Sequence, residues 1–201
     1  MVEYDPTFYN KDWFMYLSRF DSVLETALYA AFAHLGKPSS FLDVGCGTGW
    51  LVKVCYAMGI RPSYGIELSP DVKSVFPDER TRLIYIHDLR KPIHLGMTFD
   101  MVWCVEVAEH LPPEASEVLC NTLAEHTGKV LVFTAASVGQ GGDQHVNEQP
   151  PEFWRELLTA RGLVYDAAST EHLRETWRWT TGPCFWMPAN VQIFRAGDKQ
   201  P

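Results

Sequence analysis

The 201-residue sequence has no long hydrophobic run, no excess of positive charge and no cysteines at paired spacing. A membrane-spanning helix requires about 20 consecutive apolar residues, and no segment of this chain approaches that length. Lys and Arg number 17 against 25 Asp and Glu, which gives a net charge of −8. Because binding to nucleic-acid backbones depends on Lys and Arg, this balance argues against a nucleic-acid partner.

The five cysteines are scattered, and the first 13 residues are polar and acidic. Small secreted domains carry cysteines at framework spacings, and secretory signals carry an apolar segment. We therefore expect reduced thiols, no secretory signal, no membrane contact and a cytoplasmic location. A chain of this length, with 46% apolar and 21% charged residues, suits a single domain over residues 1–201.

A glycine-rich turn follows an apolar segment in the string FLDVGCGTGW, residues 41–50. Glycines at alternate positions let the backbone turn sharply and approach a ligand, and residues 51–58 that follow have helical character. A dinucleotide fingerprint is G-x-G-x-x-G, whereas the third glycine here comes one residue early. Asp43 suits an ammonium or sulfonium better than a diphosphate, and Glu67 can accept both hydroxyls of a ribose. The alternative is a glycine turn that only connects a strand to a helix.

Strand and helix patterns alternate along the chain. From residue 8 to residue 34 apolar residues recur at three- to four-residue steps, which predicts one or two helices in an N-terminal cap over residues 1–36. Strands are expected at 40–44, 64–67, 83–87, 101–105, 130–134, 163–169 and 185–195, and helices at 51–58, near 71, at 113–125 and at 150–162. This alternation predicts a doubly wound α/β fold.

The string LDVGCGTG, residues 42–49, resembles the first motif of the class I S-adenosylmethionine-dependent methyltransferases. The resemblance continues at residues 65–70, 87–89 and 99–111, and covers roughly residues 40 to 135. It implies a Rossmann-like, doubly wound, seven-stranded sheet with helices on both faces, mostly parallel and closed by a C-terminal antiparallel hairpin. It also implies S-adenosylmethionine as the cofactor.

Ligands of open α/β sheets bind outside the carboxyl ends of the strands. Asp43 should lie near the methionine ammonium of the cofactor, and Glu67 should hold the ribose. Asp88 should accept a hydrogen bond from the adenine amine while the Leu89 backbone meets the ring, although an Asp at this position is also typical of a helix cap. The expected cofactor-binding residues are Asp43, Gly45, Cys46, Gly47, Glu67, Leu68, Asp88, Leu89, Cys104 and Val105.

The string EVAEH, residues 106–110, places two carboxylates and an imidazole on one face if this turn is helical. Such donors form a reasonable site for magnesium, manganese or zinc. The segment resembles the E-x-x-E-H segment of the ubiquinone-biosynthesis O-methyltransferases and of the small-RNA 3′-terminal 2′-O-methyltransferases, in which a further histidine completes a metal site. The resemblance implies a metal set of Glu106, Glu109, His110 and His145. In the metal-free alternative, His110 and His145 are the catalytic residues that orient the acceptor and take its proton.

His145 lies in a glycine-rich loop at residues 137–149 that has no apolar period. We expect this loop to be mobile and to cover the acceptor together with residues 4–20. The other histidines are expected to be structural or exposed, and the tryptophans to form core and pocket wall. Residues 174–179 mix arginine with tryptophan, a combination that can stack bases, but we interpret them as an amphipathic strand or a pocket wall.

The expected function is methyl transfer from S-adenosylmethionine to a small-molecule acceptor, at a hydroxyl oxygen. A DNA-amine methylase is disfavoured because the strand at 101–105 is not followed by a [DNS]-P-P-[YFW] motif. Two alternatives remain open at this stage. One is a metal-dependent RNA 3′-terminal 2′-O-methyltransferase, and the other is a non-catalytic S-adenosylmethionine-binding protein.

Overall fold

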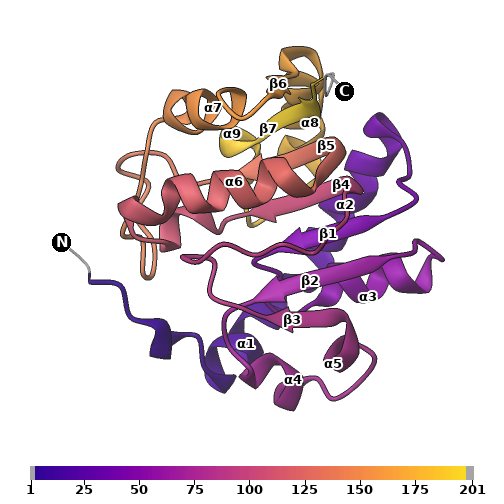
Figure 1. Ribbon diagram of the computed structural model, residues 1–201, viewed down its shortest axis with the longest axis vertical. Helices are drawn as coiled ribbons and strands as arrows, with labels where there is room; N and C mark the ends of the chain where they lie inside the picture. Colours follow the sequence, from indigo (N-terminus) through magenta and orange to yellow (C-terminus); the bar gives the residue numbers. More distant parts are fainter. Residues whose placement is uncertain (1–2, 198–201) are drawn as a thin grey trace.

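The computed structural model describes residues 3–197, which form a seven-stranded sheet flanked by helices (Figure 1). The strands are β1 (Phe41–Val44), β2 (Ser63–Glu67), β3 (Ile84–Ile86), β4 (Phe99–Val105), β5 (Thr127–Thr134), β6 (Leu163–Tyr165) and β7 (Gln192–Ala196). Their order across the sheet is β3-β2-β1-β4-β5-β7-β6. The first five of these are parallel, whereas β7 is antiparallel to both β5 and β6. The predicted sheet and its antiparallel C-terminal closure are confirmed.

Helices cover both faces of the sheet. They are α1 (Lys11–Leu17), α2 (Asp21–Leu35), α3 (Trp50–Ala57), α4 (Asp71–Val75), α5 (Arg80–Leu83), α6 (Ser116–His126), α7 (Pro151–Thr159), α8 (Ala167–Thr180) and α9 (Met187–Asn190), with short 3-10 turns at η1 (Pro6–Phe8), η2 (Ser18–Phe20), η3 (Ala108–His110) and η4 (Pro113–Ala115). Within residues 3–197, none of these helices combines the length and the hydropathy needed to span a membrane.

Alternating residues of the central strands supply two separate cores, because successive side chains of a strand point to opposite faces. Val102 and Cys104 of β4 pack with α6 and α7. Met101 and Trp103 of the same strand pack with α2, α3, α8 and α9. Figure 1 shows α6 crossing in front of the sheet, on the first of these faces. Strands that are buried on both faces are typical of a parallel sheet.

The predicted N-terminal helices are confirmed, but they serve two different layers. α2 packs on the sheet through Ala27, Leu28 and Ala31, which are fully buried. The preceding α1 lies beside α4 instead (Figure 1). Its buried residue Phe14 packs with Val72 of α4 and Ile84 of β3. The segment up to Phe20, together with Leu24 of α2, lines the cavity at the carboxyl ends of the strands.

The interpretation of residues 163–195 was partly wrong. The expected strand at 163–169 ends at Tyr165, and residues 167–180 form α8. The expected strand at 185–195 begins only at Gln192, after α9. Asp166 starts α8 as its N-cap, since its side chain accepts a hydrogen bond from the Ser169 amide at 2.9 Å. Few apolar residues mark this helix, and the tryptophans two positions apart imitate the alternation of a strand.

The buried face of α8 includes Leu173 and Trp177, four residues apart as one helix face requires. The Trp177 indole is fully buried and donates to the Ala27 carbonyl of α2 at 3.1 Å. Ion pairs join Glu171 to Arg174, and Glu175 to Arg178, on the exposed side. Residues 174–179 are thus part of a covering helix and not of an amphipathic strand or a pocket wall.

Replacing the two tryptophans of α8 tests this assignment. Trp177→Ala should lower the free energy of unfolding by about 3 to 5 kcal/mol, because a fully buried aromatic side chain is removed. Trp179 is 87% exposed, so Trp179→Ala should change the free energy of unfolding by less than about 0.5 kcal/mol. Urea denaturation of both variants measures the difference. Residues two apart share one face of a strand, so equal losses would contradict the helix.

Candidate active site

A cavity of about 550 Å³ opens at the carboxyl ends of β1, β2 and β4. It is lined by most of the residues that the sequence singled out: Asp43, Gly45, Cys46, Gly47, Glu67, Leu68, Val105, Glu106, Glu109, His110 and His145. Three expected cofactor residues lie outside the lining. Asp88 forms an ion pair with Arg90 at 2.9 Å, and Leu89 and Cys104 are buried in the core. Residues of the segment 4–20, which we expected beside the acceptor, also line the cavity, and Leu24 and residues 184–187 supply walls that no motif marked.

The glycine turn after β1 is in close contact with two distant parts of the chain. Gly45 and Gly47 have φ angles of 76° and 51°, in the left-handed region that favours glycine. A Cβ atom on Gly45 would lie 2.5 Å from the Val107 side chain, and one on Gly47 would lie 2.6 Å from Leu17. Larger residues at these positions would therefore displace either the loop after β4 or the end of α1.

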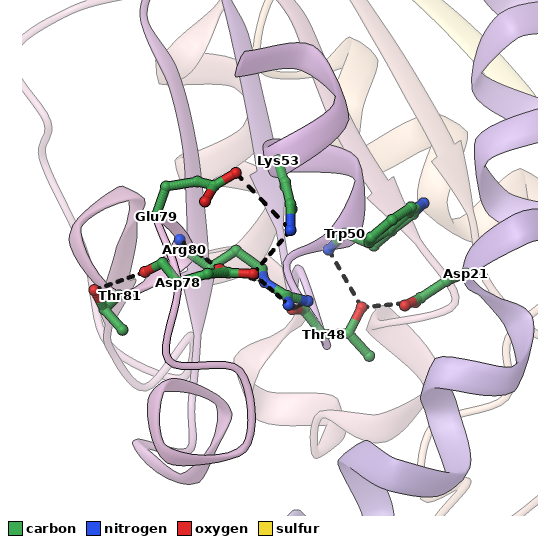
Figure 2. Close-up of polar contacts among 8 residues, drawn as sticks. All are labelled: Asp21, Thr48, Trp50, Lys53, Asp78, Glu79, Arg80 and Thr81. Carbon is green, nitrogen blue, oxygen red and sulfur yellow. Dashed lines mark hydrogen bonds and ion pairs between the residues drawn. The ribbon is translucent and has the colours of Figure 1, made fainter. Parts of the chain in front are cut away.

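A polar network fixes the other side of the turn, as Figure 2 shows. The Thr48 hydroxyl donates to Asp21 of α2 at 2.7 Å and accepts from the Trp50 amide at 3.2 Å. Arg80, which is 6% exposed, donates to the Thr48 carbonyl at 3.1 Å. The same guanidinium donates to both carboxylate oxygens of Asp78 at 2.8 and 2.7 Å, which holds the pKa of Asp78 well below its usual range. α2 and α5 are thereby tied to the turn.

Glu67 is held in place by the backbone of the same turn. Its carboxylate accepts from the amides of Gly47 at 2.9 Å, Leu68 at 2.7 Å and Ser69 at 3.3 Å. Burial raises the pKa of Glu67 to about 7, although these three amide donors lower it. A carboxylate offers about four acceptor positions. One position on Oε2 therefore remains for a ligand.

Asp43 is 4% exposed and makes no side-chain hydrogen bond within residues 3–197. Burial, and then the charge of Glu67, raise the pKa of Asp43 to about 8. A buried carboxylate without a partner is costly to ionise. A cationic group in the cavity would supply the missing partner, so the donor set at this end fits an ammonium or sulfonium ligand.

The expected helical face of residues 106–110 was wrong. Only residues 108–110 form a turn, of the 3-10 type, and Glu106 has a φ of 55° outside it. The Glu106 carboxylate accepts from the Thr134 hydroxyl at 2.6 Å and from Asn190 at 3.4 Å. Glu106 is therefore engaged elsewhere, and it does not belong to the group of potential metal ligands formed by Glu109, His110 and His145.

In this group the three potential ligand atoms lie within 4.8 Å of one another. Glu109 is fully buried, and no side chain of residues 3–197 donates a hydrogen bond to its carboxylate. Burial, and then Glu106, raise the pKa of Glu109. Burial, followed by His145, lowers the pKa of His110 to about 4, so its imidazole is neutral at neutral pH. Unpaired buried donors of this kind fit a divalent cation, which would compensate the cost of burying the carboxylate.

Glu148 organises the loop that carries His145. Its carboxylate accepts from the amides of Gly139 at 2.8 Å and Gly141 at 2.6 Å, and it contacts His145 Nδ1 at 2.9 Å. Asn147 is 2% exposed and donates to the Ser116 hydroxyl at 3.0 Å, which is a structural contact. This internal network was not foreseen from the sequence. The mobility of the loop stays a prediction.

The sequence matches a family described as a methyltransferase domain over residues 16–168. The chain belongs to this family. The prediction of a class I S-adenosylmethionine-dependent methyltransferase is thus confirmed, and the protein is an enzyme. The narrower resemblance to the ubiquinone-biosynthesis enzymes stays a prediction. The comparison with curated proteins gave no match.

Several solved structures share the fold of this methyltransferase. DesVI of Streptomyces venezuelae is 18% identical with a TM-score of 0.62, over 91% of this chain and 95% of that chain. The sugar N-methyltransferase KedS8 of Streptoalloteichus is 17% identical with a TM-score of 0.62, over 88% and 87%. Magnesium protoporphyrin IX methyltransferase of Synechocystis, solved with bound S-adenosylhomocysteine, is 18% identical with a TM-score of 0.61, over 89% and 83%. At this identity the likeness concerns the fold alone.

The network in Figure 2 predicts that Arg80 stabilises the turn. Arg80→Lys keeps the charge but loses the paired contact with Asp78 and the bond to Thr48, and should lower the free energy of unfolding by about 1 to 3 kcal/mol. Arg82→Lys is the matched control, because the exposed Arg82 side chain donates, within residues 3–197, one hydrogen bond, to the Tyr56 hydroxyl at 3.2 Å. Urea denaturation and hydrogen exchange at residues 45–50 measure both effects. Equal behaviour of the two variants would contradict the assignment.

Proposed function

We propose that this enzyme transfers the methyl group of S-adenosylmethionine to a hydroxyl oxygen of a small molecule. The observation that carries the proposal is that one cavity has two chemically different ends. At one end Asp43 and Glu67 offer buried carboxylates to a cationic nucleoside. At the other end Glu109, His110 and His145 offer groups that can bind or deprotonate a hydroxyl.

The cofactor is proposed to bind across the glycine turn. Its ammonium group pairs with Asp43, the carboxylate that lacks a protein partner. One ribose hydroxyl donates to the remaining acceptor position of Glu67, whose other positions the backbone amides occupy. The left-handed backbone at Gly45 and Gly47 shapes the turn that lines this end of the cavity. The magnesium protoporphyrin IX methyltransferase of Synechocystis, which shares the fold, was solved with bound S-adenosylhomocysteine, and this supports the choice of cofactor.

The reaction is an in-line displacement. The acceptor oxygen forms a bond to the methyl carbon while the bond from that carbon to sulfur breaks, and S-adenosylhomocysteine leaves. Positioning of the two reactants supplies about 7 to 11 kcal/mol in favourable cases. The acceptor proton passes to an imidazole, which is worth about 10² to 10⁴-fold. In the absence of a metal ion we assign this base to His145, because Glu148 contacts its Nδ1 and orients the ring.

A divalent cation is proposed at Glu109, His110 and His145, with Glu148 behind His145 as the group that orients its ring. Two imidazoles and one carboxylate favour zinc or manganese over magnesium, which prefers oxygen ligands. When bound, the cation would lower the pKa of an acceptor hydroxyl. In its absence, His110 orients the acceptor and His145 takes the proton.

Calorimetry tests the cofactor assignment. A bound cation favours the ionised form of Asp43. Where the free carboxyl is protonated, cofactor binding must therefore release a proton. The affinity for the cofactor should thus rise with pH toward about 8, the pKa of Asp43. Between pH 6 and 7.5 the ionisation of Asp43 should raise the cofactor affinity of the wild type about tenfold per pH unit. Asp43→Asn should bind more weakly at pH 7.5 and lose that slope, and Glu67 accounts for any slope that remains. A slope unchanged in the variant would contradict the role of Asp43.

Methyl transfer itself is measured as release of S-adenosylhomocysteine from labelled cofactor with a library of hydroxyl compounds. Glu67→Ala should weaken cofactor binding by about 1.5 to 3 kcal/mol, since a hydrogen bond to a charged acceptor is lost. Failure of S-adenosylmethionine to bind the wild type would reject the proposed function as a whole.

Metal binding is tested with a matched pair of variants. Zinc or manganese should titrate into the wild type and into Glu106→Gln, because Glu106 is engaged by Thr134 and Asn190. Glu109→Gln should lose at least about tenfold in metal affinity, as expected when a ligand is altered. Metal content after dialysis provides a readout that is independent of turnover. Equal metal content in Glu109→Gln and wild type would place any cation elsewhere.

A further inference from the structure

The cavity lining is acidic in composition. Its lining, within the described residues, contains no lysine and no arginine. It contains the carboxylates of Asp43, Glu67, Glu106, Glu109 and Asp143. Such a surface suits S-adenosylmethionine, which carries a net positive charge through its sulfonium and ammonium groups. It opposes a ligand with a permanent negative charge.

Two arginines near the cavity are already paired, whereas Arg19 is exposed and lies over the Tyr16 ring, 5.7 Å from its centroid. Arg80 lies under the glycine turn, bonded to both oxygens of Asp78. Arg90 is bonded to both oxygens of Asp88 and lies over the Tyr4 ring, 4.5 Å from its centroid. Inside the cavity, an acceptor bearing a phosphate or carboxylate would lose its hydration without meeting a Lys or Arg side chain.

The first aromatic wall comes from the N-terminal segment. The rings of Tyr9, Trp13, Tyr16 and Phe20 form a continuous row, with successive centroids 6.0, 5.7 and 5.6 Å apart. The edge of the row meets the potential ligand group, because the Tyr9 and His110 rings are 6.1 Å apart. All four rings of the row line the cavity.

The second aromatic wall is formed by Phe185 and Trp186, at the start of α9. Figure 1 places α1 beside α4 below the sheet and α9 beside β7 above it, so the two walls come from opposite ends of the strand order. Phe185 is 78% exposed and Tyr16 is 44% exposed. Large rings left open at a cavity mouth gain apolar burial when a ligand covers them.

We propose that the acceptor is an uncharged aromatic alcohol, a phenol that carries no phosphate or carboxylate. This inference rests on the proposed function. The ring of the acceptor packs between the two aromatic walls, where offset or edge contacts between rings are favourable. Its hydroxyl faces the group of Glu109, His110 and His145. A phenol is neutral when it enters, and without a bound cation it loses its proton to His145 as the new bond from carbon to oxygen forms. The same lining disfavours the phosphate-bearing end of an RNA.

Matched pairs of ligands test the charge preference. Methyl esters of hydroxybenzoic and hydroxycinnamic acids are compared with the free acids, which differ in one negative charge. Calorimetry on the enzyme saturated with S-adenosylhomocysteine should show at least about tenfold tighter binding of the esters. Asp143→Lys should narrow that difference, because it adds a cation to the lining. Equal or tighter binding of the acids by the wild type, or binding of neither set, overturns the proposal.

Two variants test the aromatic wall. Phe185→Ala should weaken ester binding by at least about fivefold, and Trp179→Ala should leave it unchanged, since Trp179 is equally exposed but lies outside the cavity. Equal effects of the two variants overturn the role of the wall.

Binding of S-adenosylmethionine, measured separately, distinguishes failure of this inference from failure of the proposed function. If the cofactor binds and methyl groups reach anionic acceptors, only this inference fails, whereas absence of cofactor binding rejects the proposed function.

Discussion

The contact between the glycine turn and its two neighbours is the constraint on which the rest of the site depends. Gly45 and Gly47 have no side chain, so Val107 and Leu17 occupy the space that a Cβ atom would fill. That packing brings the end of β1, the loop after β4 and the end of α1 to one point. Asp43 and Glu67 lie next to this point, and residues 108–110 follow Val107 directly. The cofactor end and the acceptor end of the cavity thus share one set of backbone positions.

This arrangement leaves buried carboxyl groups that no cationic side chain of the cavity lining neutralises. Within residues 3–197, no side chain donates a hydrogen bond to Asp43 or Glu109, and burial raises the pKa of each. A structure selected for stability alone would pair or replace such groups, because an unpaired buried charge is costly. Glu67 and Glu106 differ, since backbone amides or neighbouring side chains satisfy them. We therefore expect ligands at the groups that lack a partner. Glu106 is held by the scaffold, and Glu67 combines both roles, with backbone amides on three acceptor positions and one position left for a ligand.

The sequence predicted the sheet because its signals are local. Apolar strands that end in Asp43 or Glu67, and the glycines between them, need no knowledge of distant residues. The polar network around Thr48 was missed because Asp21 and Arg80 come from separate elements and belong to no motif. Helix α8 was missed because only Leu173 and Trp177 among its large apolar residues are buried, and long-range packing on α2 decides its conformation.

The same reasoning separates the two glutamates of the EVAEH string. From spacing alone Glu106 and Glu109 are equivalent candidates, since a helix would place both beside His110. The backbone instead bends at Glu106, where a φ of 55° is uncommon for a residue with a side chain. The bend lets Glu106 reach Thr134 at the end of β5, while Glu109 faces the two histidines. The hydrogen bond to Thr134 thereby offsets the backbone strain at Glu106. The bend divides the EVAEH string into a structural part at Glu106 and a part at Glu109 and His110 that faces the proposed ligand.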